Sequence, residues 1–193
     1  DSAVEEINPK QSYVRLNSKE IIEYDQLIIA TGTKGYKLNI PGGEQAQTLY
    51  SINDAHKLAN SIAKAKKIAV IGGGFIGCEI ASGVQKLNKD VTLLETGPSI
   101  LGRSVAPIFA ESVSKIHHSQ GIKILTNCKA LSINNRGVET TSSIISADLV
   151  VAGIGVTPNI ELATEANLDI DNGILVNKLL QTSNENIFAI GDI

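Results

Sequence analysis

One stretch of the chain constrains its fold more than any other. Residues 68–71 are a hydrophobic run rich in β-branched side chains, and Gly72, Gly74 and Gly77 follow it in the pattern Gly-x-Gly-x-x-Gly. A second apolar run, VTLLE, ends on the acidic Glu95. A strand, a glycine-rich turn, a helix and a second strand closed by an acid make up a dinucleotide-binding signature. The sequence therefore predicts a nucleotide site on a mainly parallel, helix-covered sheet.

Each glycine of this turn has its own physical task. Gly72 permits a tight turn out of the strand, Gly74 lets the backbone approach a pyrophosphate, and Gly77 lets the helix pack close to the sheet. Phe75 and Ile76 begin that helix. The free N–H groups and the positive dipole end of its N-terminus favour a bound anion, so these residues are predicted to hold the cofactor pyrophosphate.

Glu95 predicts which nucleotide is preferred. A carboxylate at this position can accept hydrogen bonds from the two ribose hydroxyls of an adenosine, whereas it repels a 2′-phosphate. We therefore expect NAD(H) to bind in preference to NADP(H).

Composition and charge exclude several classes of protein. Of the 193 residues, 42% are hydrophobic and 19% charged, as in ordinary globular proteins. The net charge of −3 gives no reason to expect nucleic acid or an anionic membrane as a partner. The apolar runs are far shorter than the roughly 18–20 residues that a membrane-spanning helix needs.

Cys78 and Cys128 form no Cys-x-x-Cys pair. We interpret them as buried structural thiols of a protein in a reducing, cytoplasmic compartment. Any electron transfer must then run through a cofactor.

The remaining elements follow from periodicity and turn residues. Residues 11–24 predict a hairpin and QLIIATG a buried strand, followed by an irregular loop over residues 33–43. A helix is expected over 52–65 with Asn53 or Asp54 as its N-cap, then strand 68–71, helix 75–88, strand 91–95, helix 105–119, strand 122–125, a meander over 129–145 and strand 147–155. Further on, a short helix near 160–166 and two strands, ILVN and NIFAIGD, are expected.

These elements predict an α/β fold in which residues 34–156 form an inserted nucleotide-binding domain. The flanking residues 1–33 and 157–193 are then parts of a second domain, whose remainder we expect to lie outside this sequence.

Four motifs in order, IEYDQLIIATG, VIGGGFIGCE, DLVVAGIGVTPN and NIFAIGD, resemble the two-dinucleotide flavoprotein reductases. Residues 148–192 are most similar to the ferredoxin and rubredoxin reductases of oxygenase systems, and apoptosis-inducing-factor-type oxidoreductases are relatives. The resemblance implies a Rossmann-like NAD-binding domain, a parallel sheet plus a β-meander, flanked by segments of an FAD-binding domain. It also implies an FAD-dependent NADH reductase that passes electrons to a small iron–sulfur or rubredoxin-type protein.

The resemblance also implies roles for individual residues. Thr31 and Gly32 would lie against FAD, and Gly191 and Asp192 would form its second motif, with the aspartate holding a ribityl hydroxyl. From the residues alone, Asp192 is equally compatible with an ordinary turn.

A second group would face the nicotinamide. Gly153, Ile154 and Gly155 match the strand-end backbone beside that ring, and Glu79 matches an acidic residue near it that we take as the catalytic candidate. Glu79 is equally explained as a favourable charge near a helix N-terminus.

The sequence also departs from the family. Lys34 and Lys37 occupy a segment where relatives often carry arginine, and lysine lacks the bidentate fork of a guanidinium. The first FAD glycine motif, the flavin-side lysine and the C-terminal interface domain have no counterpart. We therefore expect a fragment that binds NADH weakly and carries no flavin by itself.

The alternative function is a nucleotide-binding sensor or signalling flavoprotein module without turnover. A flavin-free dehydrogenase is disfavoured because no tyrosine is followed by a lysine in the Tyr-x-x-x-Lys pattern. Lys64, Lys66 and Lys67 are expected to be a solvated surface, with a docking patch for an acidic electron carrier as the other interpretation.

Overall fold

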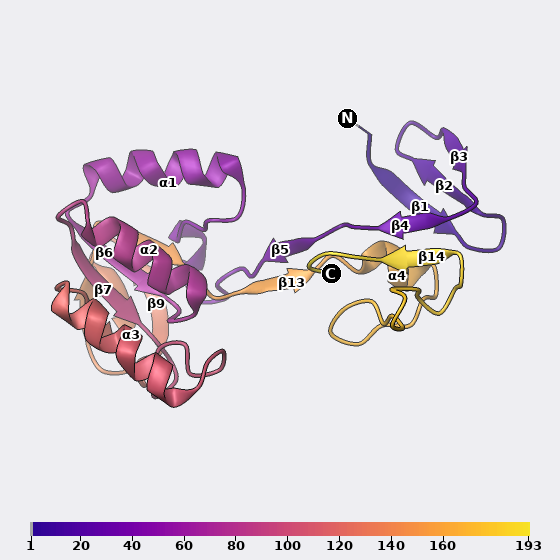
Figure 1. The fold of residues 1–193 in the computed structure, drawn as a ribbon. Coiled ribbons are helices and arrows are strands. Elements are labelled where there is room, and N and C mark those ends of the chain that lie inside the picture. Colours follow the sequence, from indigo (N-terminus) through magenta and orange to yellow (C-terminus); the bar gives the residue numbers. More distant parts are fainter. Residues whose placement is uncertain (1) are drawn as a thin grey trace. The chain divides into compact units, whose positions relative to one another are not determined.

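The computed structural model describes residues 2–193. The chain divides into two compact units, one made of the residues up to Lys34 together with Val156–Ile193, the other of Gly35–Gly155. Figure 1 shows the ribbon and labels most of its helices and strands. Each unit has a hydrophobic core of its own.

The larger unit, Gly35–Gly155, is built on a four-stranded sheet with the order β12-β6-β7-β8. Every neighbouring pair in this sheet is parallel. The strands are β6 (Lys67–Ile71), β7 (Asp90–Leu94), β8 (Lys123–Leu125) and β12 (Leu149–Ala152). Parallel strands are normally covered on both faces, which explains why β6 and β12 have apolar side chains without alternation.

Helices cover one face of this sheet. Helix α2 (Phe75–Gln85) connects β6 to β7, and α3 (Pro107–Ser119) connects β7 to β8. Their core includes the fully buried Val70, Leu93 and Val151. The order strand, helix, strand, helix, strand agrees with the prediction, although α2 ends at Gln85 rather than at residue 88.

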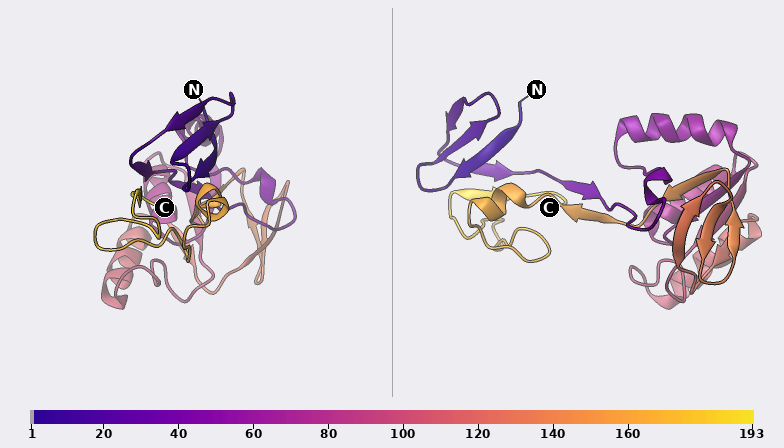
Figure 2. Two further views of the ribbon diagram at one scale, coloured as in Figure 1. Left: turned by 90° about the vertical axis from the view of Figure 1, so that its right-hand side faces the viewer. Right: turned by 180° about the vertical axis from the view of Figure 1, so that it is seen from behind.

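A β-meander covers the other face. Strands β9 (Ala130–Asn134), β10 (Gly137–Thr140) and β11 (Ile144–Ser146) pair in antiparallel fashion. Their buried Ile133 and Val138 pack with Ala69 and Leu94 of the parallel sheet. Figure 2 shows the meander on the side of the sheet opposite to α2 and α3. The predicted fold class, α/β with a parallel sheet plus a meander, is confirmed for this unit.

Helix α1 (Ile52–Lys64) begins at the predicted residue, but its N-cap differs from the prediction. Its N-cap is Ser51, so the predicted caps Asn53 and Asp54 were wrong. The Ser51 hydroxyl accepts from the Asp54 N–H (3.1 Å), and the Asp54 carboxylate accepts from the Ser51 N–H (2.9 Å). In this reciprocal capping box, the backbone N–H groups of Ser51 and Asp54 each find a side-chain acceptor.

We expect Ser51→Ala to lower the free energy of unfolding by about 1 kcal/mol, because the orphaned N–H of Asp54 loses its acceptor. Urea denaturation monitored by circular dichroism measures this loss. Ser51→Thr is the control, since it keeps the hydroxyl and should unfold close to the parent midpoint. Equal losses in the two variants would contradict the capping box.

The smaller unit carries a three-stranded antiparallel sheet and a two-stranded parallel pair. Strands β1 (Val4–Asn8), β2 (Tyr13–Leu16) and β3 (Ile21–Glu23) are antiparallel, which confirms the predicted hairpin and adds β1. Strand β4 (Leu27–Ile29) pairs in parallel with β14 (Ile187–Ala189). Helix α4 (Glu161–Glu165) packs through Ala163 into the same core as the buried Ile7 and Ile187.

Three expectations for this part of the chain were wrong. Strand β4 is not buried throughout, because Ile28 is 59% exposed. The ILVN segment is not a strand, and Ile174 forms only an isolated bridge with Ile170. The loop 33–43 contains regular structure: β5 (Thr33–Gly35), which pairs with β13 (Val156–Pro158), and the 3-10 helix η1 (Gly43–Gln45).

Residues 2–193 include no helix that is both long and apolar enough to span a membrane.

Candidate nucleotide-binding site

The turn between β6 and α2 depends on Gly72. Its φ of +104° is a value that side chains rarely allow, and an added Cβ would run into the Gly153 carbonyl. The Gly72 N–H donates to the Leu94 carbonyl (2.8 Å), which joins the turn to the end of β7. The geometry therefore agrees with the task predicted for this glycine.

Gly74 leaves open space at the start of α2. It is the N-cap of that helix, with extended backbone, and an added Cβ would have none of the described atoms within 4 Å. The first turn of a helix carries N–H groups without intrahelical partners. Open space in front of such groups is what the approach of a pyrophosphate requires.

Gly77 brings α2 against the turn. A Cβ on Gly77 would overlap with the Gly72 carbonyl. On its other side, a Cβ on Gly153 would lie 3.0 Å from the Gly77 nitrogen. Close contact of helix, turn and the end of β12 therefore requires glycine at each of these positions.

A cleft of about 980 Å³ opens along the carboxyl ends of the parallel strands, within the larger unit. Its volume lies at the upper end of the range of small-molecule sites. Ligands of open α/β sheets bind at this edge. The lining comprises residues 71–76, 94–99, 101–104, 128 and 153–155.

The cleft gathers most of the predicted cofactor residues of this unit. Gly72, Gly74, Phe75, Ile76, Glu95, Gly153, Ile154 and Gly155 all line it. Gly77 lies behind the turn and shapes it. Glu79 is exposed on α2 and is not part of the lining, so its catalytic role stays a prediction.

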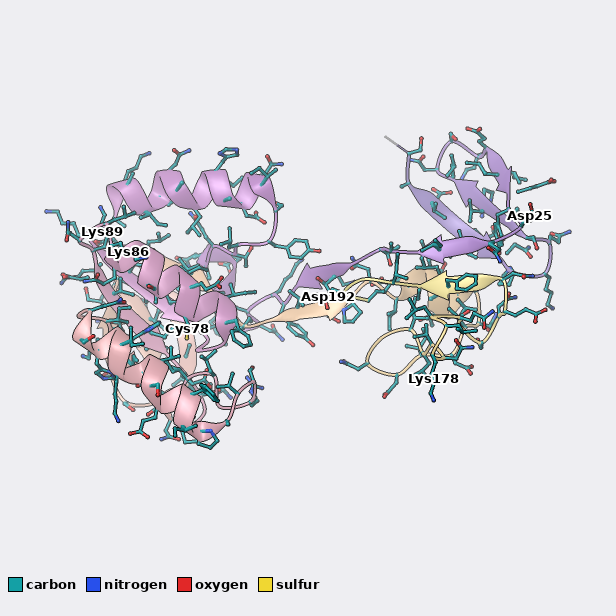
Figure 3. All side chains as sticks on the ribbon, in the orientation of Figure 1. Asp25, Cys78, Lys86, Lys89, Lys178 and Asp192 are labelled. Carbon is teal, nitrogen blue, oxygen red and sulfur yellow. The ribbon has the colours of Figure 1, made fainter. Side chains whose placement is uncertain are left out.

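The predicted FAD residues lie in the smaller unit. The Thr31 hydroxyl donates to the Asn159 carbonyl (2.8 Å), and the Asn159 side-chain amide donates to the Thr31 carbonyl (2.9 Å). Gly32 and Gly191 have φ values of +64° and +88°, and the carboxylate of Asp192 is exposed (Figure 3). These facts describe their conformation and leave their cofactor role a prediction.

Glu95 is buried in the cleft, and both of its carboxylate oxygens accept hydrogen bonds. Its side chain is only 8% exposed. One carboxylate oxygen, Oε2, accepts from the Gly73 N–H (2.7 Å), and the other, Oε1, accepts from the Gly97 N–H (2.7 Å). The Thr96 hydroxyl also donates to Oε1 (3.2 Å). The acid therefore contacts the glycine turn directly.

The loop after β7 was missed by the sequence analysis. It lines the cleft with Thr96, Ser99, Arg103 and Ser104, and Arg103 is the single cation among the described lining residues. The signal was present: the stretch TGPSILGRS is rich in glycine and serine and follows directly on the acid that ends a strand. Loops at the carboxyl edge of a parallel sheet are where ligands bind.

Both cysteines are free and buried, as predicted. Burial, together with the negative charge of Glu95, raises the pKa of the Cys78 thiol to about 11. The thiol is therefore protonated at neutral pH and a poor nucleophile. Cys78 lies on α2 inside the larger unit (Figure 3). Residues 2–193 contain no His, Cys, Asp and Glu grouping suited to a metal ion.

The Lys64, Lys66 and Lys67 group lies at the opposite edge of the sheet. Lys67 begins β6, whereas the cleft lies beyond the strand's carboxyl end at Ile71. The group is exposed, which agrees with a solvated surface.

A glycine turn between a buried parallel strand and a helix, beside a cleft at the carboxyl edge, defines the larger unit as a Rossmann-type dinucleotide-binding domain. The pyridine nucleotide-disulphide oxidoreductase family matches residues 1–193, and the chain belongs to this family.

Two similar curated proteins are reductases. The chain is 39% identical over 187 residues to rhodocoxin reductase from Rhodococcus erythropolis, covering 93% of the chain and 44% of that protein. It is 34% identical over 194 residues to a rubredoxin-NAD(+) reductase from Pseudomonas putida, covering 96% and 50%. The chain thus spans about half the length of the curated relatives it matches.

A solved structure agrees with the fold. The ferredoxin reductase from Rhodopseudomonas palustris superposes with a TM-score of 0.95 at 30% identity, covering all of this chain and 50% of that one. The resemblance to ferredoxin and rubredoxin reductases is therefore confirmed.

Proposed function

We propose that this chain is the NADH-binding portion of an FAD-dependent NADH reductase that passes electrons to a small redox protein. The observation that carries the proposal is the cleft, where the open glycine turn and the buried Glu95 lie together. Membership of the oxidoreductase family and the reductase names of its relatives support it. The same names favour a reductase over a sensor module without turnover.

In this proposal residues 34–156 bind NADH. The pyrophosphate lies at the N-terminus of α2, where a Cβ on Gly74 would intrude, and Glu95 accepts from the adenosine ribose. The backbone of residues 153–155 lies beside the nicotinamide, with Glu79 near that ring. The open space at Gly74 fits a diphosphate, because backbone N–H groups and a helix dipole face it.

Residues 1–33 and 157–193 contribute to an FAD site in this proposal. Thr31, Gly32, Gly191 and Asp192 contact the flavin nucleotide from one side. When bound, the nicotinamide supplies a hydride and the flavin accepts it and releases single electrons. The protein's own part is to bind and orient each ring for this transfer.

We propose a small iron–sulfur or rubredoxin-type protein as the electron acceptor and the cytoplasm as the place of action. The name of the Pseudomonas putida relative, a rubredoxin-NAD(+) reductase, supports the acceptor class. The two unpaired cysteines support a reducing compartment. The group Lys64, Lys66 and Lys67 is not assigned to docking, because it lies at the edge of the sheet away from the cleft.

The test is the flavin content of the full-length protein. We expect a yellow protein whose flavin absorbance is bleached by NADH in the absence of oxygen and restored by an oxidised rubredoxin or ferredoxin. A colourless protein, or a flavin that NADH does not bleach, would contradict the reductase. A flavin that is bleached but transfers nothing to either carrier would favour the sensor module.

Nucleotide preference gives a second test. We expect NADH to bind the full-length protein at least about tenfold more tightly than NADPH, because a 2′-phosphate would face a buried carboxylate of like charge. The measurement is the dissociation constant from quenching of nicotinamide fluorescence, at one ionic strength for both nucleotides. Comparable constants would mean that Glu95 does not face the adenosine ribose.

A further inference from the structure

We propose that Glu95 has a second task besides meeting the ribose: its carboxylate holds the glycine turn in the conformation that receives the pyrophosphate. Glu95 is then a positioning residue for a group that it does not itself touch. This inference rests on the proposed function, in which the cleft binds NADH.

Gly73, in the middle of the turn, is held from both sides. Its N–H donates to Glu95 Oε2 (2.7 Å), and its carbonyl accepts from the Leu101 N–H (2.7 Å). A Cβ on Gly73 would lie 2.9 Å from Glu95 Oε2 and 2.9 Å from Cγ2 of Ile100. The turn is therefore packed closely at Gly73, and the Glu95 carboxylate is the polar group that contacts it.

The same carboxylate holds the loop on the other side of the cleft. Glu95 Oε1 accepts from the Gly97 N–H and from the Thr96 hydroxyl. Leu101, farther along this loop, is buried in a left-handed conformation with φ of +56°, and its N–H donates to the Gly73 carbonyl. Glu95 thus joins the two loops that form the walls of the nucleotide cleft.

These contacts require a carboxylate. Each oxygen accepts from a different backbone N–H, and Oε1 also accepts from the Thr96 hydroxyl. An ionised carboxylate has about four acceptor sites, so both loops can be bound with one site left for a ribose hydroxyl. A glutamine of the same size has one acceptor oxygen and one NH₂ group. Its NH₂ would face either the buried Gly73 N–H or the partly buried Gly97 N–H, and that donor would lose its acceptor.

The two tasks of Glu95 can be separated by changing the ligand. The probe is the NADH analogue with 2′,3′-dideoxyadenosine, which keeps the pyrophosphate and the nicotinamide but lacks both hydroxyls that Glu95 could bind. If Glu95 acts only through the ribose, Glu95→Gln has no effect on this analogue. If Glu95 also positions the turn, the loss persists, as in a double-mutant cycle between protein and ligand.

We expect Glu95→Gln in the full-length protein to weaken the dideoxy analogue at least about fivefold, because a turn that has lost this contact is less often in the conformation that receives the pyrophosphate, and apparent affinity falls with that fraction. Dissociation constants come from quenching of nicotinamide fluorescence, so catalytic turnover is not needed. Unchanged affinity for the analogue, with weakened NADH, would overturn the second task. If the parent protein bound neither nucleotide, the proposed function would fail, and this inference with it.

Two further variants complete the test, one as a control and one that changes the turn directly. Glu139→Gln is the matched control: Glu139 is exposed on β10, where it accepts from the Ser132 hydroxyl (2.8 Å), and we expect both nucleotides to bind as in the parent. Gly73→Ala leaves Glu95 in place but pushes the turn away from it. We expect this variant to weaken NADH and the analogue by the same factor. A normal affinity of Gly73→Ala for both would overturn the proposal even if Glu95→Gln failed to fold.

Discussion

Replacing Gly74 with valine is expected to abolish NADH binding in the full-length protein while leaving the fold intact. The backbone of Gly74 is extended, with φ of −77°, so valine adopts it without strain. An added Cβ would have none of the described atoms within 4 Å, so the new side chain begins in the open space in front of α2. We place the pyrophosphate in that space. The valine side chain would therefore remove all contacts between the pyrophosphate and the backbone N–H groups at the start of α2.

The measurement is a fluorescence titration of the variant with NADH up to millimolar concentration, beside a thermal melt. Loss of glycine at an N-cap is expected to change the free energy of unfolding by about 1 kcal/mol or less. A Gly74→Val protein that melts like the parent and still binds NADH would show that the pyrophosphate lies elsewhere.

Gly77→Ala is expected to lower the stability of the fold, whereas Gly74→Val affects NADH binding. A single added methyl group causes this loss of stability. Its Cβ would overlap with the Gly72 carbonyl, and neither the helix backbone nor the turn can move without disturbing the buried sheet. We expect the free energy of unfolding to fall by about 3 kcal/mol or more, at the upper end of overpacking penalties.

Gly83 provides the matched control on the same helix. It is exposed, and a Cβ there would have no described atom within 4 Å. Gly83→Ala should therefore leave stability unchanged or raise it by up to about 1 kcal/mol, because alanine favours helix over glycine. Urea denaturation of the two variants gives the comparison. If Gly77→Ala unfolded at the same urea concentration as Gly83→Ala, α2 would not be packed against the turn.

Local signals accounted for most of the nucleotide unit. The strand before Gly72, the helix after Gly74 and the strand ending at Glu95 are each fixed by short-range patterns of apolar and glycine residues, and β6, α2 and β7 form where expected. The N-cap of α1 was missed although the Ser51-x-x-Asp54 pattern is itself a local signal. Asn53 and Asp54 are themselves common capping residues, so residue type alone did not distinguish them from Ser51.

Segment 174–177 shows why apolar composition alone misleads. ILVN has the residues of a strand, but the Asn177 side-chain oxygen accepts from the N–H groups of Leu179 and Gln181. These bonds turn the chain back at once, with Leu180 in a left-handed conformation at φ of +63°. A side chain that bonds neighbouring backbone in this way competes with strand pairing.

The contacts of Glu95 lay beyond sequence reasoning for a different reason. The pattern places an acid at the end of β7, which is enough to suggest a ribose ligand. It does not say that the loop after β7 turns back so that Leu101 and Glu95 both bind Gly73. Such a contact depends on the path of an irregular loop, and such paths follow from packing with the whole unit.

The pairing of β4 with β14 has a consequence for how the chain folds. Ile29 and Ala189 are neighbours across that parallel pair although the whole larger unit lies between them in sequence. Closing a long unstructured loop before any contact forms is entropically costly and slows folding. The larger unit holds its own ends together, since the Tyr36 N–H donates to the Gly155 carbonyl (3.0 Å). Once that unit has formed, the loop that remains to be closed is short, so the discontinuous unit is expected to acquire its protection from hydrogen exchange last.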